Sequence, residues 1–188
     1  MRAALRIVAL LSAILAVVPA SYVYAAADVG QPAPALVAQE LSGQTFDLAA
    51  QRGKVVVINF WATWCPPCRK EMPSLDAFYR KYHAQGLEMI GMSVDRPHDS
   101  SEVHNVMQLY SYPAAMSEDA KVNEFGSPDT VPLTFVVDSK GIVRAKLTPD
   151  ETPVTEKTLA TVVVPLLPAK NATGWSTNPG NAGGGAKP

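Results

Sequence analysis

The segment KVVVINFWATWCPPCRKEMPSLDAFYRKYHAQGLEMIGMSVD (residues 54–95) decides the fold of this chain. It begins with Lys54 to Ala62, a run of β-branched and aromatic residues with little alternation, which is typical of a strand buried on both faces. From Pro67 the apolar residues recur at helical spacing, and Gly86 ends that helix. Leu87 to Asp95 is again strand-like. A strand, a helix and a strand of these lengths predict a βαβ unit with a right-handed crossover.

The segments on either side of this unit complete a sheet covered by helices. Hairpins are predicted at residues 35–50 and 132–147, each with a glycine at its turn. Further helices are predicted at residues 101–109, 119–125 and 155–167. Together these elements predict an α/β fold: a central mixed sheet with helices on both faces and an N-terminal β-hairpin.

Composition limits the class of protein. The chain has 188 residues, of which 47% are hydrophobic and 18% are charged. Such a chain can bury a core, and its length suits one domain with extensions at the ends. The formal net charge is −1, with no obvious basic stretch. We therefore expect no nucleic-acid partner.

Residues 1–25 have the layout of an export signal. Arg2 and Arg6 precede an uninterrupted apolar run from Ile7 to Val18, and small residues follow at Val23 to Ala25. The alternative is a retained membrane anchor, because the segment 7–27 is long enough to span if it is not cleaved. Both readings predict an exported protein, in which a disulfide persists.

The opposite end predicts a flexible tail. Residues 170–188 are rich in Gly, Asn, Ala and Pro and cannot bury enough apolar surface to offset the entropy of ordering them. The sequence therefore predicts one folded domain over residues 28–169.

The chain has two cysteines, Cys65 and Cys68, three positions apart. As a structural disulfide they would close too short a loop to stabilise the fold. A structural zinc site needs four ligands, and the three histidines form no partner pattern. A two-thiolate copper(I) site stays open as an alternative.

Redox chemistry fits the pair best. If Cys65 ends the strand and Pro66 and Pro67 open the helix, the sulfur of Cys65 faces unpaired backbone N–H groups that stabilise a thiolate. Cys68, one turn further along, is then placed to attack a mixed disulfide on Cys65. This chemistry needs no cofactor other than the redox-active disulfide itself.

These residues carry a resemblance to a known family. NFWATWCPPCRKEMP (residues 59–73) resembles the active site of exported thioredoxin-like thiol–disulfide oxidoreductases, the TlpA/ResA-like group, which includes the reductases of cytochrome c maturation. Residues 29–60 and 130–147 are similar to the group's N-terminal hairpin with its first core strand and to its later pair of strands. The resemblance implies a thioredoxin-like fold and a location in the periplasm or on the outer face of the cell membrane.

The resemblance also implies roles for particular residues. Cys65 would attack and Cys68 would resolve. Pro132 would be the cis-proline beside the disulfide, and Glu71 would be the group's glutamate, which holds a proton for Cys68 or raises the pKa of the cysteines. A helix-terminus charge is the alternative for Glu71. The surface implied to bind substrate consists of Trp64, Pro66, Pro67 and Val131.

The implied activity is reduction of disulfides in exported client proteins, such as apocytochrome c. The enzyme would then need electrons, which the resemblance assigns to a membrane thiol–disulfide donor. Three alternatives are a thiol oxidant of the same fold, a copper(I) carrier and a thiol peroxidase. The chain does not match the peroxidase pattern Pro-X3-Thr-X2-Cys, because Ile58 stands at the proline position and Ala62 at the threonine position.

Overall fold

The computed structural model describes residues 27–168. The predicted export signal (residues 1–25) and the predicted tail (residues 170–188) lie outside the described residues. Within the described part, no helix is both long and apolar enough to cross a membrane.

A five-stranded mixed sheet forms the centre of the fold, with strand order β5-β4-β3-β7-β8. β3 lies in the middle, pairs in parallel with β4 and antiparallel with β7, and is buried along its whole length, as its apolar run predicts. The five strands are β3 (Val55–Trp61), β4 (Leu87–Ser93), β5 (Ala114–Met116), β7 (Leu133–Val137) and β8 (Val143–Leu147). The mixed sheet and the thioredoxin-like fold are therefore confirmed.

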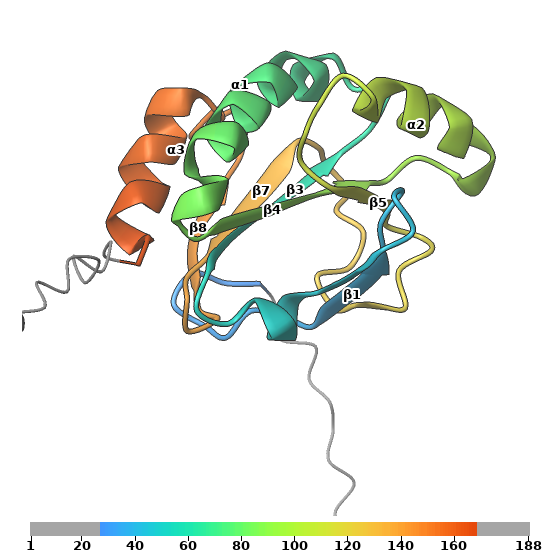
Figure 1. Cartoon of the computed structure of the whole chain (residues 1–188). Helices are drawn as coiled ribbons and strands as arrows, with labels where there is room; N and C mark the ends of the chain where they lie inside the picture. Colours follow the sequence, from blue (N-terminus) through green and yellow to red (C-terminus); the bar gives the residue numbers. More distant parts are fainter. Residues whose placement is uncertain (1–26, 169–188) are drawn as a thin grey trace, which may run out of the picture.

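The α-helices are α1 (Pro66–Tyr82), α2 (Ser100–Met107) and α3 (Glu156–Val163), and all lie on one face of the sheet (Figure 1). Their apolar residues share one core with the inward-facing residues of that face. The prediction of helices on both faces is wrong in this respect. The crossovers β3–α1–β4 and β4–α2–β5 both advance in the same direction along the sheet, and right-handed connections then place both helices on one side.

The second face is covered by a small sheet of order β2-β1-β6. It consists of β1 (Leu36–Gln39), β2 (Thr45–Asp47) and β6 (Val122–Asn123), and the hairpin of β1 and β2 is the predicted N-terminal one. The helix predicted at residues 119–125 is wrong, because two of those residues pair with β1 instead. Leu36, Phe46 and Phe135 belong to the core between the two sheets.

Short 3-10 helices connect several of these elements: η1 (Leu48–Gln51), η2 (His83–Gln85), η3 (Pro97–Asp99) and η4 (Val164–Leu166). Gly86 follows η2 with φ of 94°, a left-handed conformation that glycine adopts without strain. The α-helix itself ends at Tyr82, and the predicted stop at Gly86 is the end of the 3-10 turn that continues it.

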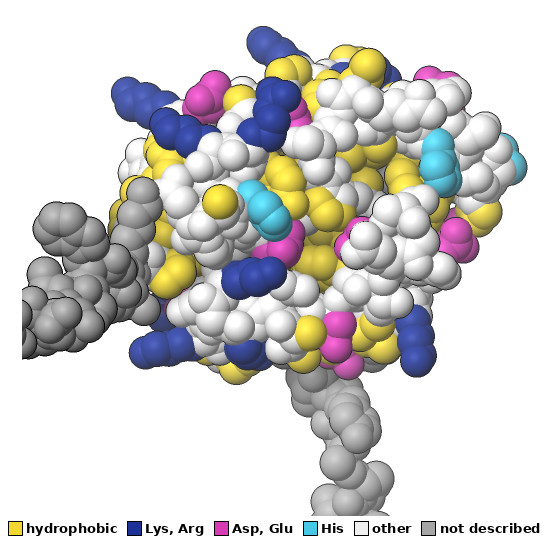
Figure 2. Space-filling model, in the orientation of Figure 1, with side chains coloured by type: hydrophobic (Ala, Val, Ile, Leu, Met, Phe, Trp, Pro, Cys, Tyr) yellow, Lys and Arg dark blue, Asp and Glu magenta, His cyan; other side chains and the backbone are white. Residues whose placement is uncertain are grey.

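Charged side chains of both signs are interspersed on the face of the described residues that Figure 2 shows.

Candidate active site

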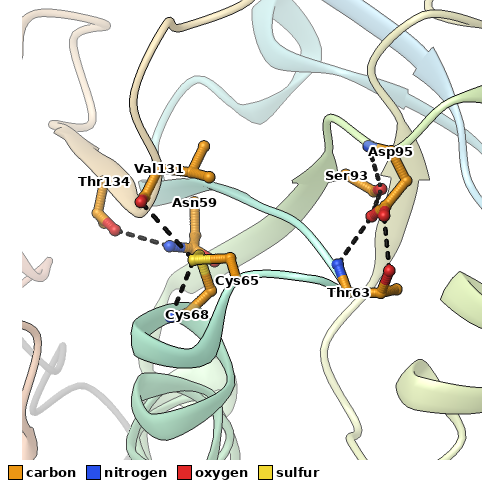
Figure 3. The surroundings of a disulfide bond; sticks show 8 residues. All are labelled: Asn59, Thr63, Cys65, Cys68, Ser93, Asp95, Val131 and Thr134. Atoms are coloured by element: carbon orange, nitrogen blue, oxygen red, sulfur yellow. Dashed lines mark hydrogen bonds between the residues drawn. A yellow bond between two sulfur atoms is a disulfide. The ribbon is translucent and has the colours of Figure 1, made fainter.

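The two cysteines lie at the junction of β3 and α1. β3 ends at Trp61, α1 begins at Pro66, and Cys65 is the N-cap residue of the helix, with extended backbone angles (φ −98°, ψ 101°). Cys65 and Cys68 form a disulfide (Figure 3). They are 4% and 2% exposed, so the bond has little contact with solvent. It belongs to the core between the helices and the sheet, which we call the helix-side core.

The helix N-terminus directs one backbone donor at the first sulfur. The N–H of Cys68 donates to Sγ of Cys65 at 3.2 Å. Pro66 and Pro67 occupy the first two helical positions and have no N–H, so Cys68 carries the first N–H of the helix. This bond and the positive end of the helix dipole favour a thiolate on Cys65 over one on Cys68.

An exposed apolar rim surrounds the buried disulfide. Trp64 directly precedes Cys65 and is 65% exposed, although tryptophan side chains are usually mostly buried. Pro66 and Pro67, between the cysteines, are also exposed. The structure thus brings three of the residues predicted to bind substrate to the surface next to the sulfurs.

The loop before β7 meets the disulfide from the other side. The carbonyl oxygen of Val131 lies 3.6 Å from Sγ of Cys65 (Figure 3). The peptide bond between Val131 and Pro132 is cis, as the resemblance implied. In the reduced state this carbonyl can accept a hydrogen bond from the thiol of Cys65 or from the backbone of a bound peptide.

Glu71 is buried on α1, one helical turn beyond Cys68. Its Oε1 accepts a hydrogen bond from the N–H of Val154 at 3.0 Å, while Oε2 is buried without a partner among the described residues. Burial raises the pKa of the Glu71 carboxyl above its ordinary value of 4.5, and the Val154 hydrogen bond lowers it by a smaller amount. The structure therefore links this carboxyl to the segment before α3.

Asn59 and Thr134 form a second polar pair in the helix-side core. They lie opposite each other on β3 and β7, and Nδ2 of Asn59 donates to Oγ1 of Thr134 at 2.9 Å. Oδ1 of Asn59 has no partner among the described residues. The described site therefore has an uncharged amide at this position.

Asp95 holds the loop that leads to the cysteines, and sequence reasoning missed it. The carboxylate is 1% exposed and accepts hydrogen bonds from the N–H of Thr63 (2.9 Å), the hydroxyl of Thr63 (2.6 Å) and the hydroxyl of Ser93 (2.7 Å), as Figure 3 shows. The available signal was an acid at the end of the strand-like run 87–95, since parallel strands β3 and β4 end at the same edge of the sheet and Asp95 lies two residues beyond β4.

The histidines take no part in this site. The ring nitrogens of His83 and His104 lie within 3.1 Å of backbone carbonyl oxygens, those of Leu87 and Ser100, respectively. Across residues 27–168, no three His, Cys, Asp or Glu side chains are grouped so that they could hold a metal ion.

Comparisons with known proteins agree with this geometry. The AhpC/TSA family model matches residues 29–146. The thiol-disulfide oxidoreductase ResA of a Bacillus cereus strain is 34% identical over 127 residues, covering 66% of this chain and 72% of that protein. ResA of a Geobacillus thermodenitrificans strain is 35% identical over 124 residues, covering 65% and 71%.

A solved structure is similar over most of its length. The crystal structure of a thiol:disulfide interchange protein of the thioredoxin family from Chlorobium tepidum TLS matches with a TM-score of 0.61 and 25% identity, covering 75% of this chain and 99% of that one. The family match spans more than half of the chain and includes both cysteines. This chain therefore belongs to the AhpC/TSA family, and within it is a thiol–disulfide oxidoreductase of the ResA type that contains the Cys65–Cys68 disulfide.

Proposed function

We propose that the protein reduces disulfides in other exported proteins, such as apocytochrome c, with Cys65 as the attacking and Cys68 as the resolving cysteine. Residues 1–25 direct export and residues 28–169 form the redox domain. The protein then acts in the periplasm or on the outer face of the membrane. If residues 7–27 are not cleaved off, this segment would tether the protein to the membrane.

The reaction transfers two electrons from the cysteine pair to the client. The Cys65 thiolate attacks one client sulfur, forms a mixed disulfide and releases the other client sulfur as a thiolate, which takes up a proton. The Cys68 thiolate then attacks the Cys65 sulfur, forms the Cys65–Cys68 disulfide and releases the second client thiolate. A membrane thiol–disulfide donor returns two electrons and two protons to complete the cycle.

The prolines of α1 carry the argument for reduction rather than oxidation. A strongly oxidising Cys-X-X-Cys protein owes its potential to a highly stabilised thiolate in the reduced form. Here Pro67 occupies the second helical position, one of the two positions whose N–H groups reach an N-cap side chain, and it has no N–H to offer, so the N–H of Cys68 donates to the sulfur of Cys65 at 3.2 Å without a second donor from Pro67. Fewer donors stabilise the thiolate less, and the dithiol gives up electrons more readily.

The neighbouring residues have supporting roles in this proposal. Glu71 accepts a proton from Cys68 when that thiol attacks, because its raised pKa suits proton transfer at a pH closer to neutral. Val131 offers its carbonyl to an extended client segment beside Pro132. Trp64, Pro66 and Pro67 supply apolar contact area.

Trapping of clients tests the roles of the two cysteines. With Cys68→Ser, mixed disulfides through Cys65 should accumulate, because the resolving thiol is missing. With Cys65→Ser, trapping should be absent and insulin reduction lost. Non-reducing gels of the two variants, exposed to exported proteins of the host, make the comparison. Equal trapping by both variants would contradict the assignment.

The reduction potential tests the direction of electron flow. We expect equilibration with glutathione to place the Cys65–Cys68 couple near the reducing end of the range of about −270 to −120 mV found among Cys-X-X-Cys proteins. A potential near the oxidising end would mean that the protein donates disulfides instead.

A further inference from the structure

A groove opens directly beside Pro132. Its cavity has a volume of about 540 Å³ and is lined by Pro132, Leu133, Phe125 and Phe135 together with residues 148–151. The rings of Phe125 and Phe135 contact each other in a tilted arrangement with centroids 5.2 Å apart; Phe135 belongs to the core between the two sheets, and Phe125 packs against it. The groove therefore has an apolar floor of fixed side chains.

Acidic side chains line the rim of this groove. They are Asp28, Asp129, Asp150 and Glu151, all exposed. None of them forms an ion pair among residues 27–168. The basic residue of the lining is Lys146, whose Nζ lies 5.8 Å from the centre of the Phe135 ring. Four acids against one base leave an excess of negative charge around an apolar floor.

The groove lies beside the loop that contacts the disulfide. Pro132 lines it, and the carbonyl oxygen of Val131, the preceding residue, lies 3.6 Å from Sγ of Cys65. A client segment that lies along Val131 while its cysteine meets Cys65 therefore runs toward the groove. A second hollow of about 360 Å³ shares Asp129 and is lined by Trp64, Val131 and Arg96, with Asp95 and Glu118 as further acids, so it lacks the apolar floor formed by Phe125 and Phe135.

We propose that this groove is a subsite for the client chain, and that it selects a segment in which an apolar side chain and a lysine or arginine flank the reacting cysteine on one side. The apolar side chain rests on the floor formed by Phe125 and Phe135, and the cation meets Asp150 and Glu151 at the rim. The inference rests on the proposed function and adds the chemical class of the substrate to it.

The test uses the reduced full-length protein and short peptides that carry one cysteine as a pyridyl disulfide. Attack on the peptide sulfur releases a pyridinethione, whose absorbance gives the second-order rate. The peptides have leucine and either lysine, glutamine or glutamate on one side of the cysteine, and a second set has them on the other side. We expect the lysine peptide to react about tenfold faster than the glutamate peptide at low ionic strength, on one side only.

The groove variant Asp150→Asn with Glu151→Gln should reduce this ratio to about twofold or less, and about 1 M salt should do the same, since the screening length is then about 3 Å. A change in the reactivity of Cys65 itself would alter the rates with the lysine and glutamate peptides equally, so it cancels in their ratio. Glu102→Gln with Asp119→Asn removes the same two charges from exposed positions outside the groove and should leave the ratio unchanged.

The outcomes separate this inference from the proposed function. If the protein reduces the glutamine peptide and insulin but shows no lysine preference, the subsite is wrong while the proposed function stands. An equal preference on both sides of the cysteine, or a ratio that survives the groove substitutions, would also overturn it. So would sedimentation data in which the groove substitutions dissociate a dimer, because a second copy would then occupy the groove.

Discussion

Two buried carboxylates, one on α1 and one just after β4, flank the redox junction, and they differ in how well their oxygens are satisfied. Asp95, after β4, accepts three hydrogen bonds from Thr63 and Ser93. Glu71, on α1, accepts one hydrogen bond through Oε1 and has no partner for Oε2 among the described residues. Both side chains are buried, at 1% and 8% exposure. Burial alone therefore does not distinguish their roles.

This difference in hydrogen bonding indicates different roles for Asp95 and Glu71. The hydrogen bonds of Asp95 replace the water that the carboxylate lost on folding, so it holds the loop around Thr63 in place. Glu71 keeps an unpaired oxygen, and burial raises its pKa. An acid whose charged form is poorly compensated holds its proton more tightly than an ordinary carboxyl does.

Removing Asp95 should have the largest effect. Asp95→Ala leaves three donors of Thr63 and Ser93 without their acceptor, and we expect the free energy of unfolding to fall by about 3 kcal/mol. Because Thr63 lies two residues before Cys65, the rate of Cys65 alkylation should also change. Urea denaturation measures the first effect and iodoacetamide kinetics the second.

Asp76 provides the matched control. It is buried on α1 and accepts hydrogen bonds from the N–H (2.6 Å) and the hydroxyl (2.7 Å) of Ser111, with Arg80 nearby. Asp76→Ala should destabilise the fold to a similar extent and leave the alkylation rate unchanged. If Asp95→Ala and Asp76→Ala altered alkylation equally, or if Asp95→Ala cost less than about 0.5 kcal/mol, Asp95 would not hold the loop.

Much of this fold could be predicted from sequence because its decisive elements are local. The run from Val55 to Trp61 is apolar enough to indicate a central strand by itself, and Gly86 marks the stop before β4. The faces occupied by the helices could not be predicted from such patterns. They depend on which edge of the sheet β5 joins, and its three residues give no signal of that pairing.

The residues of the site also fall into two groups, those that could be predicted from local sequence and those that could not. The cysteine spacing and the prolines predict the redox chemistry, because one helix turn brings these residues together. Asp95 lies 32 positions from Thr63, and Val131 lies 66 positions from Cys65. Only the pairing of strands brings those groups together. A single sequence offered the acid after a strand as a weak signal, whereas the position of Val131 came from the resemblance.

The pair Asn59–Thr134 also compares a satisfied buried polar group with an unsatisfied one, and we expect its loss to have an intermediate effect on stability. Thr134→Val keeps the shape of the side chain but removes the acceptor of Nδ2 of Asn59, whose Oδ1 is already unpaired in the described residues. We expect urea denaturation to show a loss of about 2 kcal/mol. Adding Asn59→Leu removes the stranded amide and should recover part of that loss. A neutral single variant would show that the pair contributes no stability.

Glu71→Gln should have the smallest effect on stability, with a distinctive pH dependence. Since the folded pKa of Glu71 lies above 4.5, the folded protein holds this proton more tightly than the unfolded chain does. The stability contributed by the protonated form is present below 4.5 and is lost as the pH rises through the folded pKa. Glutamine cannot ionise, and its amide oxygen can still accept from Val154.

The variant should therefore be more stable than the wild type at pH 7, and this advantage should shrink as the pH falls toward 4.5. Urea denaturation of both proteins at several pH values isolates Glu71, because all other groups titrate in both. A difference that is constant with pH would mean that folding leaves this pKa unchanged.

The same variant separates a proton acceptor from a helix-terminus charge. Loss of the negative charge one turn beyond Cys68 should favour thiolates, so Cys65 should alkylate about two- to threefold faster at neutral pH. If Glu71 also takes the proton of Cys68, Glu71→Gln should release a model client from the mixed disulfide more slowly, although its thiols are more acidic. Alkylation against pH and single-turnover release measure the two steps separately. Superimposable curves for wild type and variant would leave Asp95, and not Glu71, as the carboxylate on which the redox site depends.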